Sequence, residues 1–68
     1  MTKWFRDVSA HARAQGYLFV RRTGSGHFQF RHVQYGCTVV TAATPSDWRS
    51  LKNFHRDCRR AVTVAHGR

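Results

Sequence analysis

Acidic residues are almost missing from this chain of 68 residues, and so are lysines. Three aspartates oppose twelve basic side chains, which gives a formal net charge of +9 at pH 7. Only Lys3 and Lys52 are lysines, so arginine supplies nearly all of the positive charge. Guanidinium groups bind phosphate oxygens in pairs and stack on bases. Such a chain is typical of proteins that bind nucleic acid; the alternatives are a solvated surface or an acidic protein partner.

Other absences narrow the class of protein. The two cysteines, Cys37 and Cys58, form neither a Cys-x-x-Cys pair nor a secretory disulfide framework. No apolar run is long enough to span a membrane and no signal peptide follows Met1, so we expect a cytoplasmic protein. There are no paired carboxylates, no Ser-His-Asp arrangement and no phosphate loop with its lysine. A chain of this length also leaves no room for a cofactor domain, and we expect no cofactor.

The pattern of apolar residues predicts one small α+β domain over residues 1–62. Trp4, Val8 and Ala12 recur at helical spacing over residues 2–15, and Gly16 is placed to end that helix. Segments rich in aromatic and β-branched residues predict strands at 17–22, 27–32 and 37–42.

A second helix is predicted to begin at Thr44-Pro45-Ser46-Asp47, with Thr44 as its N-cap and Pro45 at its first position. We expect it to end near Ala61, followed by a flexible tail over residues 63–68. The order α-β-β-β-α predicts a two-layer sandwich, in which both helices cover one face of a three-stranded antiparallel sheet. The other face is expected to be open.

The strand 27–32 separates two rows of side chains, because successive residues of a strand point to opposite faces. The rows are His27, Gln29 and Arg31 on one face, and Phe28, Phe30 and His32 on the other. We expect the phenylalanines to face the helices, which leaves an imidazole, an amide and a guanidinium on the open face.

His27 is the candidate catalytic residue. RNA cleavage without a metal needs a base with a pKa near neutrality and cations that stabilise the phosphorane. Arg21 and Arg22 end the preceding strand across the same turn, and backbone N–H groups around Ser25 can receive a phosphate. The alternative is that His27 is an ordinary exposed residue beside a hairpin.

The second helix has a basic stripe and an apolar stripe. The basic stripe consists of Arg49, Lys52, Arg56, Arg59 and Arg60. The apolar stripe consists of Trp48, Leu51, His55, Cys58 and Val62. Only Asp57 within the helix body can offset the basic stripe, which favours contact with a phosphate backbone over a solvated face.

Two further sets of residues have alternative interpretations. Tyr17 and Phe19 can stack on unpaired bases if they lie on the open face; otherwise they fill the core. His55, Cys58 and Cys37 can hold zinc, but the helix positions are core-facing sites where cysteine acts as a small hydrophobe, so we expect no metal.

The chain resembles the HicA-type toxins, which are small ribonucleases of bacterial toxin–antitoxin pairs. The matching segments are Gln15-Gly16-Tyr17, the strand Phe19-Val20-Arg21-Arg22, the turn with Gly24-Ser25, and the histidine that follows it. Thr44-Pro45-Ser46-Asp47 followed by Arg49, Leu51, Asn53 and Arg59-Arg60 is similar to a divergent branch from actinobacteria and their phages. The usual family turn reads Gly-Ser-His, whereas Gly26 intervenes here before the histidine.

This resemblance implies a fold similar to the double-stranded RNA-binding domain. It also implies a metal-independent endoribonuclease that cleaves mRNA, with His27 as its catalytic residue and an acidic HicB-like antitoxin as its partner. Arg21, Arg22 and Arg31 would hold the scissile phosphate. The rival expectations are a non-catalytic RNA- or DNA-binding protein, including a phage-encoded one, and a basic protein that docks an acidic host protein.

Overall fold

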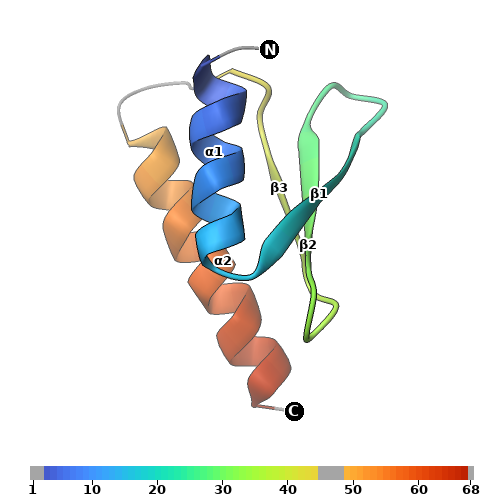
Figure 1. The fold of residues 1–68 in the computed structure, drawn as a ribbon, viewed down its shortest axis with the longest axis vertical. Coiled ribbons are helices and arrows are strands. Elements are labelled where there is room, and N and C mark those ends of the chain that lie inside the picture. The colour runs from blue at the N-terminus through green and yellow to red at the C-terminus, as the bar shows by residue number, and fades with distance from the viewer. Residues whose placement is uncertain (1–2, 45–48, 68) are drawn as a thin grey trace.

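The computed structural model describes residues 3–44 and 49–67. Its elements follow the predicted order: α1 (Lys3–Ala14), β1 (Tyr17–Arg22), β2 (Phe28–His32), β3 (Thr38–Thr41) and α2 (Ser50–His66) (Figure 1). Neither helix in this part of the chain combines the length and the apolar character that crossing a membrane requires.

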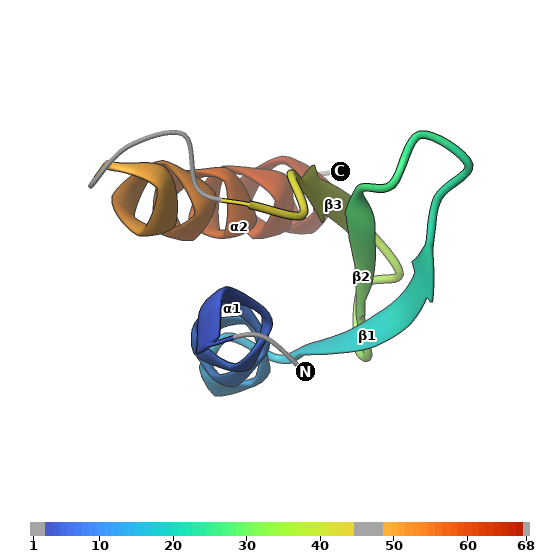
Figure 2. The ribbon, with the colours of Figure 1, turned by 90° about the horizontal axis from the view of Figure 1, so that it is seen from above.

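The three strands form one antiparallel sheet in the order β1-β2-β3. Both helices lie on the same side of this sheet, with α1 against β1, α2 against β3, and the helices in contact with each other (Figure 2). No described element covers the opposite face. The predicted two-layer α-β-β-β-α arrangement is therefore confirmed.

The side chains of β2 alternate between the two faces as predicted. Phe28, Phe30 and His32 are buried on the side of the helices. Gln29 is half-buried and Arg31 is exposed, on the uncovered side. The hydrophobic pattern therefore sets which face of the strand is covered.

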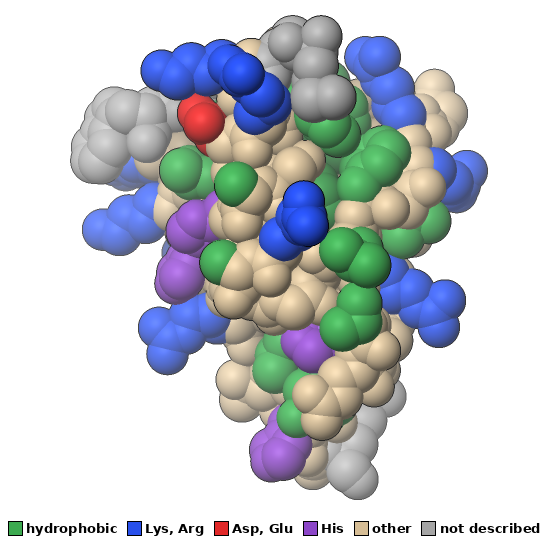
Figure 3. Space-filling model, viewed as in Figure 1, with side chains coloured by type: hydrophobic (Ala, Val, Ile, Leu, Met, Phe, Trp, Pro, Cys, Tyr) green, Lys and Arg blue, Asp and Glu red, His purple; other side chains and the backbone are tan. Residues whose placement is uncertain are grey.

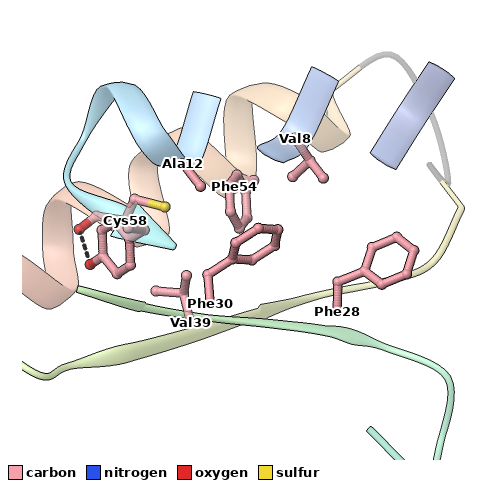
Figure 4. Close-up of a cluster of buried hydrophobic side chains, with 8 residues drawn as sticks. Val8, Ala12, Phe28, Phe30, Val39, Phe54 and Cys58 are labelled. Atoms are coloured by element: carbon pink, nitrogen blue, oxygen red, sulfur yellow. Dashed lines mark hydrogen bonds between the residues drawn. The ribbon is translucent and has the colours of Figure 1, made fainter. Parts of the chain in front are cut away.

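Aromatic rings from the sheet meet apolar side chains from both helices in the core. Figure 4 shows Phe28, Phe30 and Val39 on the strands, directed toward Val8, Ala12, Phe54 and Cys58 on the helices. The rings of Phe30 and Phe54 pack edge to face, with centroids 5.5 Å apart. The predicted apolar stripe of α2 did not include Phe54, which is buried in the structure. The buried face of the helix is therefore rotated from the predicted stripe toward Phe54, and His55 is half-buried at its margin.

Tyr17 joins the start of β1 to α2. Its side chain is fully buried, and its hydroxyl donates a hydrogen bond of 2.8 Å to the backbone carbonyl of Cys58 (dashed line in Figure 4). Burial raises the pKa of the Tyr17 hydroxyl, which therefore stays protonated and available as a donor. Tyr17 belongs to the core, and the interpretation of this residue as a platform for stacked bases was wrong.

Gly16 ends α1, as predicted, and glycine is needed there for two reasons. Its φ of +89° lies in the left-handed region, which other residues rarely adopt. A Cβ at this position would also lie 2.7 Å from Nε2 of the buried His32. The end of α1 is therefore packed directly against the end of β2.

The bounds of α2 differ from the prediction. Within the described residues the helix begins at Ser50. Arg49 precedes it with helical φ and ψ, and its side chain makes no capping hydrogen bond. Pro45-Ser46-Asp47, the predicted start, lies outside the described residues. At the other end the helix continues to His66, so residues 63–66 of the predicted tail belong to α2. Val62 is half-buried against the core, and the Thr63 hydroxyl donates to the carbonyl of Arg59, which extends the helix beyond Ala61.

We expect Phe30→Ala to lower the free energy of unfolding by about 3–5 kcal/mol, because it leaves a cavity where the sheet meets Phe54. Gln29→Ala is the matched control, since the neighbouring side chain faces the uncovered side and its loss should cost less than about 0.5 kcal/mol. Urea denaturation followed by circular dichroism measures both values. Equal destabilisation by the two variants would contradict the assignment of faces.

Candidate nucleic-acid interface

The turn between β1 and β2 projects away from both helices (Figures 1 and 2). The backbone N–H of Thr23 donates to the carbonyl of His27 at 2.8 Å, and the N–H of His27 donates to the Thr23 hydroxyl at 3.1 Å. Gly26 closes the turn with a φ of +86° and an N–H that donates to the Thr23 carbonyl. The turn is thus held by its own hydrogen bonds and presents its side chains to solvent.

His27 lies in this turn and is exposed, one residue before β2 begins. The predicted strand from residue 27 is therefore one residue too long, and the turn, not the strand, orients the imidazole. Nδ1 of His27 lies 3.2 Å from the Ser25 hydroxyl, which lies 3.1 Å from the Thr23 hydroxyl. When Nδ1–H donates to Ser25, the lone pair of Nε2 is free, as a general base requires.

Arg21 and Arg22 flank the turn on opposite faces of the sheet. Arg22 is paired with Phe28, its guanidinium lies 5.8 Å from the centre of the Phe28 ring, and its Nε donates to the carbonyl of Gly26 at 3.4 Å. Arg21 is paired with Gln29, and its Nε donates to the Gln29 side-chain oxygen at 3.3 Å on the open face. Of these two cations, Arg22 is the one held against the turn that carries His27.

Arg31 does not join this group. It is four residues from His27 along an extended segment, a separation of about 13 Å. Its guanidinium lies over the β2–β3 turn, where a Cβ on Gly36 would be 3.5 Å from Nη2. The expected cluster of three arginines around one imidazole is therefore divided: Arg22 and Ser25 lie at the turn with His27, and Arg31 extends to the other end of the sheet.

The open face of the sheet carries apolar side chains between its polar ones. Leu18 faces outward opposite Arg31, and Val40 faces outward opposite Gln29; they are 51% and 50% exposed. Phe19 lies on the helix side, where its ring contacts Phe5, Phe28 and Phe30. The aromatic platform considered for this face is therefore absent from the described residues, because Tyr17 and Phe19 both lie on the side of the helices.

The basic stripe of α2 forms a second cationic surface. Its members Arg49, Lys52, Arg56, Arg59 and Arg60 are all exposed. Four of them line one shallow depression together with Asn53, His55 and Thr63. Asp57 forms an exposed ion pair with Arg56 at 4.0 Å, a contact that solvent weakens strongly. Figure 3 shows Lys and Arg side chains at the edges and near the centre of one face of the molecule, with little acidic surface among them. This surface suits a polyanion, and it is separate from the β1–β2 turn.

Two histidines that are far apart in the sequence meet where α1 contacts α2. Nε2 of His11 contacts Nδ1 of His55, and the Gln15 side chain lies 3.2 Å from the same His55 nitrogen. Burial, and then the neighbouring His55, lower the pKa of His11. Sequence reasoning missed this contact, because nothing local indicates which residues of two helices will face each other.

The other histidines also have defined surroundings. Nδ1 of the buried His32 accepts hydrogen bonds from the backbone N–H groups of Gln34 and Tyr35, at 3.1 and 3.2 Å. His32 thus holds the β2–β3 turn. His66 contacts the Tyr35 hydroxyl at 3.2 Å. Neither ring lies near the β1–β2 turn, so His27 is the histidine that the structure leaves available there.

The described residues contain no group of three or more His, Cys, Asp and Glu side chains that could hold a metal. Cys58 is buried in the core, and burial raises the pKa of its thiol to about 12. Cys37 contacts the Tyr17 hydroxyl at 3.5 Å. The zinc interpretation of His55, Cys58 and Cys37 is therefore unsupported.

No protein-family model, no curated protein and no solved structure matches this chain significantly.

The His11–His55 contact predicts a stability that falls in weak acid. Because the pKa of His11 is below its ordinary value of 6.5 in the folded protein, the unfolded chain binds more protons as the pH falls through that value. The unfolding midpoint should therefore decrease between about pH 7.5 and pH 5. His11→Gln should show a smaller decrease in thermal denaturation, and His66→Gln, away from the helix contact, should keep the wild-type slope. Identical slopes for the wild type and His11→Gln would contradict this account.

Proposed function

We propose that this protein binds RNA and cleaves it without a metal, as a HicA-like toxin acting on mRNA in the cytoplasm. The observation that carries the proposal is the exposed His27 imidazole beside the Ser25 hydroxyl, in a projecting turn against which Arg22 is held. A base, a hydroxyl and a guanidinium are thus available at one solvent-accessible point of a chain with a net charge of +9.

In the proposed reaction, Nε2 of His27 removes the proton from a ribose 2′-hydroxyl. The 2′-oxygen attacks the adjacent phosphorus, and the bond from phosphorus to the 5′-oxygen breaks. The imidazolium then returns the proton to the leaving 5′-oxygen. The products are a 2′,3′-cyclic phosphate and a 5′-hydroxyl. Arg22 would offset the extra negative charge of the phosphorane.

The basic stripe of α2 would bind the phosphate backbone away from the cleaved bond. Its arginines and Lys52 are exposed along one side of the helix, a geometry that supports salt-dependent binding with little base preference. An acidic HicB-like antitoxin would be the protein partner, since it would neutralise these surfaces.

A second candidate is an RNA- or DNA-binding protein without catalysis. It is favoured by the position of Arg31, which extends away from His27 and leaves Arg22 as the cation held against that turn. Metal-free cleavage usually draws on more than one cationic group to stabilise the phosphorane. The third candidate, a basic protein that docks an acidic host protein, would account for the charge alone.

Cleavage of RNA by the purified protein in the presence of EDTA separates these candidates. We expect cleavage by the wild type and a loss of about 10²–10⁴-fold in rate for His27→Ala, with unchanged RNA affinity. His66→Ala removes a histidine outside the turn and should cleave at the wild-type rate. Cleavage by His27→Ala at the wild-type rate would show that His27 is not the general base. Binding without cleavage by the wild type would establish the non-catalytic protein, and the absence of any RNA or DNA binding would leave the docking protein.

Removal of two cations from the basic stripe should weaken RNA binding in a way that salt reveals. We expect Arg56→Ala/Arg59→Ala to reduce the slope of log K against log salt by about 0.7 per lost contact with single-stranded RNA. Arg6→Ala/Arg13→Ala is the matched control, because it removes the same charge from exposed positions on α1. Fluorescence anisotropy at several salt concentrations measures both slopes, and equal slopes would show that net charge, not the α2 surface, binds the RNA.

A further inference from the structure

The two edges of the sheet differ in how they are protected against pairing with another strand. The β1 edge has an irregular register between Phe19 and Arg21 and ends in two arginines. The β3 edge reads Thr-Val-Val-Thr, with four β-branched residues, no charge and no proline. Proteins commonly protect an edge strand with charges, prolines or bulges, and β3 has none of these.

A groove of about 700 Å³ runs between β3 and α2. The strand contributes Val39 on its covered side and Val40, whose side chain faces the open side, and the helix contributes Ala61 and Val64. Val64 is 52% exposed, so apolar surface remains uncovered although α2 packs on the sheet. Figure 2 shows β3 as the outermost strand on the side of the sheet nearest α2. An incoming strand could pair with β3 while its side chains contact the helix.

Asp57 and Arg60 also line this groove. The whole chain has a net charge of +9, so a second copy would bring two strongly positive bodies together. An acidic partner would instead gain from the same field, and Arg60 could pair with a carboxylate beside the groove. The charge therefore favours a partner of opposite sign.

We propose that the groove between β3 and α2 binds an extended acidic segment of a partner protein, which adds to the sheet as a fourth strand. Side chains of an added strand alternate between two faces. One set, apolar, would enter the groove against Ala61 and Val64. The other set, acidic, would lie over the open face, where β3 is paired with the strand that carries Arg31. This site is separate from the β1–β2 turn and does not depend on the proposed cleavage of RNA.

A synthetic peptide of alternating valine and aspartate tests the proposal. We expect it to bind the full chain in fluorescence anisotropy and to slow amide hydrogen exchange at Thr38–Thr41. A peptide of the same sequence with N-methyl groups on alternate residues has the same charge. It lacks the backbone N–H donors along one edge and so cannot form the hydrogen bonds of a β-ladder there. It should bind at least about tenfold more weakly. Equal binding of both peptides would show that charge alone attracts them and would overturn the proposal.

Two matched variants locate the site. Val64→Glu places a negative charge in the groove and should weaken binding of the valine–aspartate peptide about tenfold. Val33→Glu adds the same charge at another exposed valine, outside the groove, and should retain the wild-type affinity. Equal affinities of the two variants would refute the location. Sedimentation equilibrium tests whether a second copy of the chain occupies the groove. If the free chain forms a dimer and Val64→Glu dissociates it, the occupant is a second copy, and the proposal of an acidic partner is overturned.

Discussion

The burial of alternate β2 side chains beneath two helices is the constraint on which the rest of this structure depends. Phe28 and Phe30 pack the sheet against α1 and α2. Because side chains alternate along a strand, Gln29 and Arg31 then point to the uncovered face. A slip of one residue would bury Arg31 and expose Phe30. Through the register, the same constraint assigns a face to each residue of β3 and to every residue of β1 except Val20, which lies at the register shift.

The near absence of acids determines how the cations are arranged. With few carboxylates to pair with, the positive side chains remain at the surface and spread apart. Arg21 and Arg22 lie on opposite faces of β1 because side chains alternate along a strand, and the α2 stripe forms a surface of its own. Over residues 3–44 and 49–67 the cations form several surfaces and no single basic cleft, which suits contact with an extended polyanion better than enclosure of a small one.

The histidines show how one residue type acquires different roles from its surroundings. His32 is buried and accepts two backbone hydrogen bonds, while His11 and His55 meet between the helices. His27 is held by hydroxyl groups in a turn and stays open to solvent. The sequence favours His27 as the candidate for proton transfer, because a turn and two arginines lie beside it, whereas the surroundings of the other histidines are not evident from the sequence. Packing removes most of these others as candidates, because a ring that is committed to holding a turn or a helix contact cannot also reach a substrate.

The order of the elements, the bounds of β1, the glycine that ends α1 and the covered face of β2 follow from the sequence alone. Each is set by chemistry within a few residues: side-chain period, β-branched composition, or a backbone angle that only glycine adopts readily. The contact between His11 and His55, 44 residues apart, the burial of Phe54 and the direction of Arg31 were decided by the tertiary structure. They depend on how helices cross and where a turn places a side chain, and no local pattern carries that information, because residues distant in sequence become neighbours only after the layers pack.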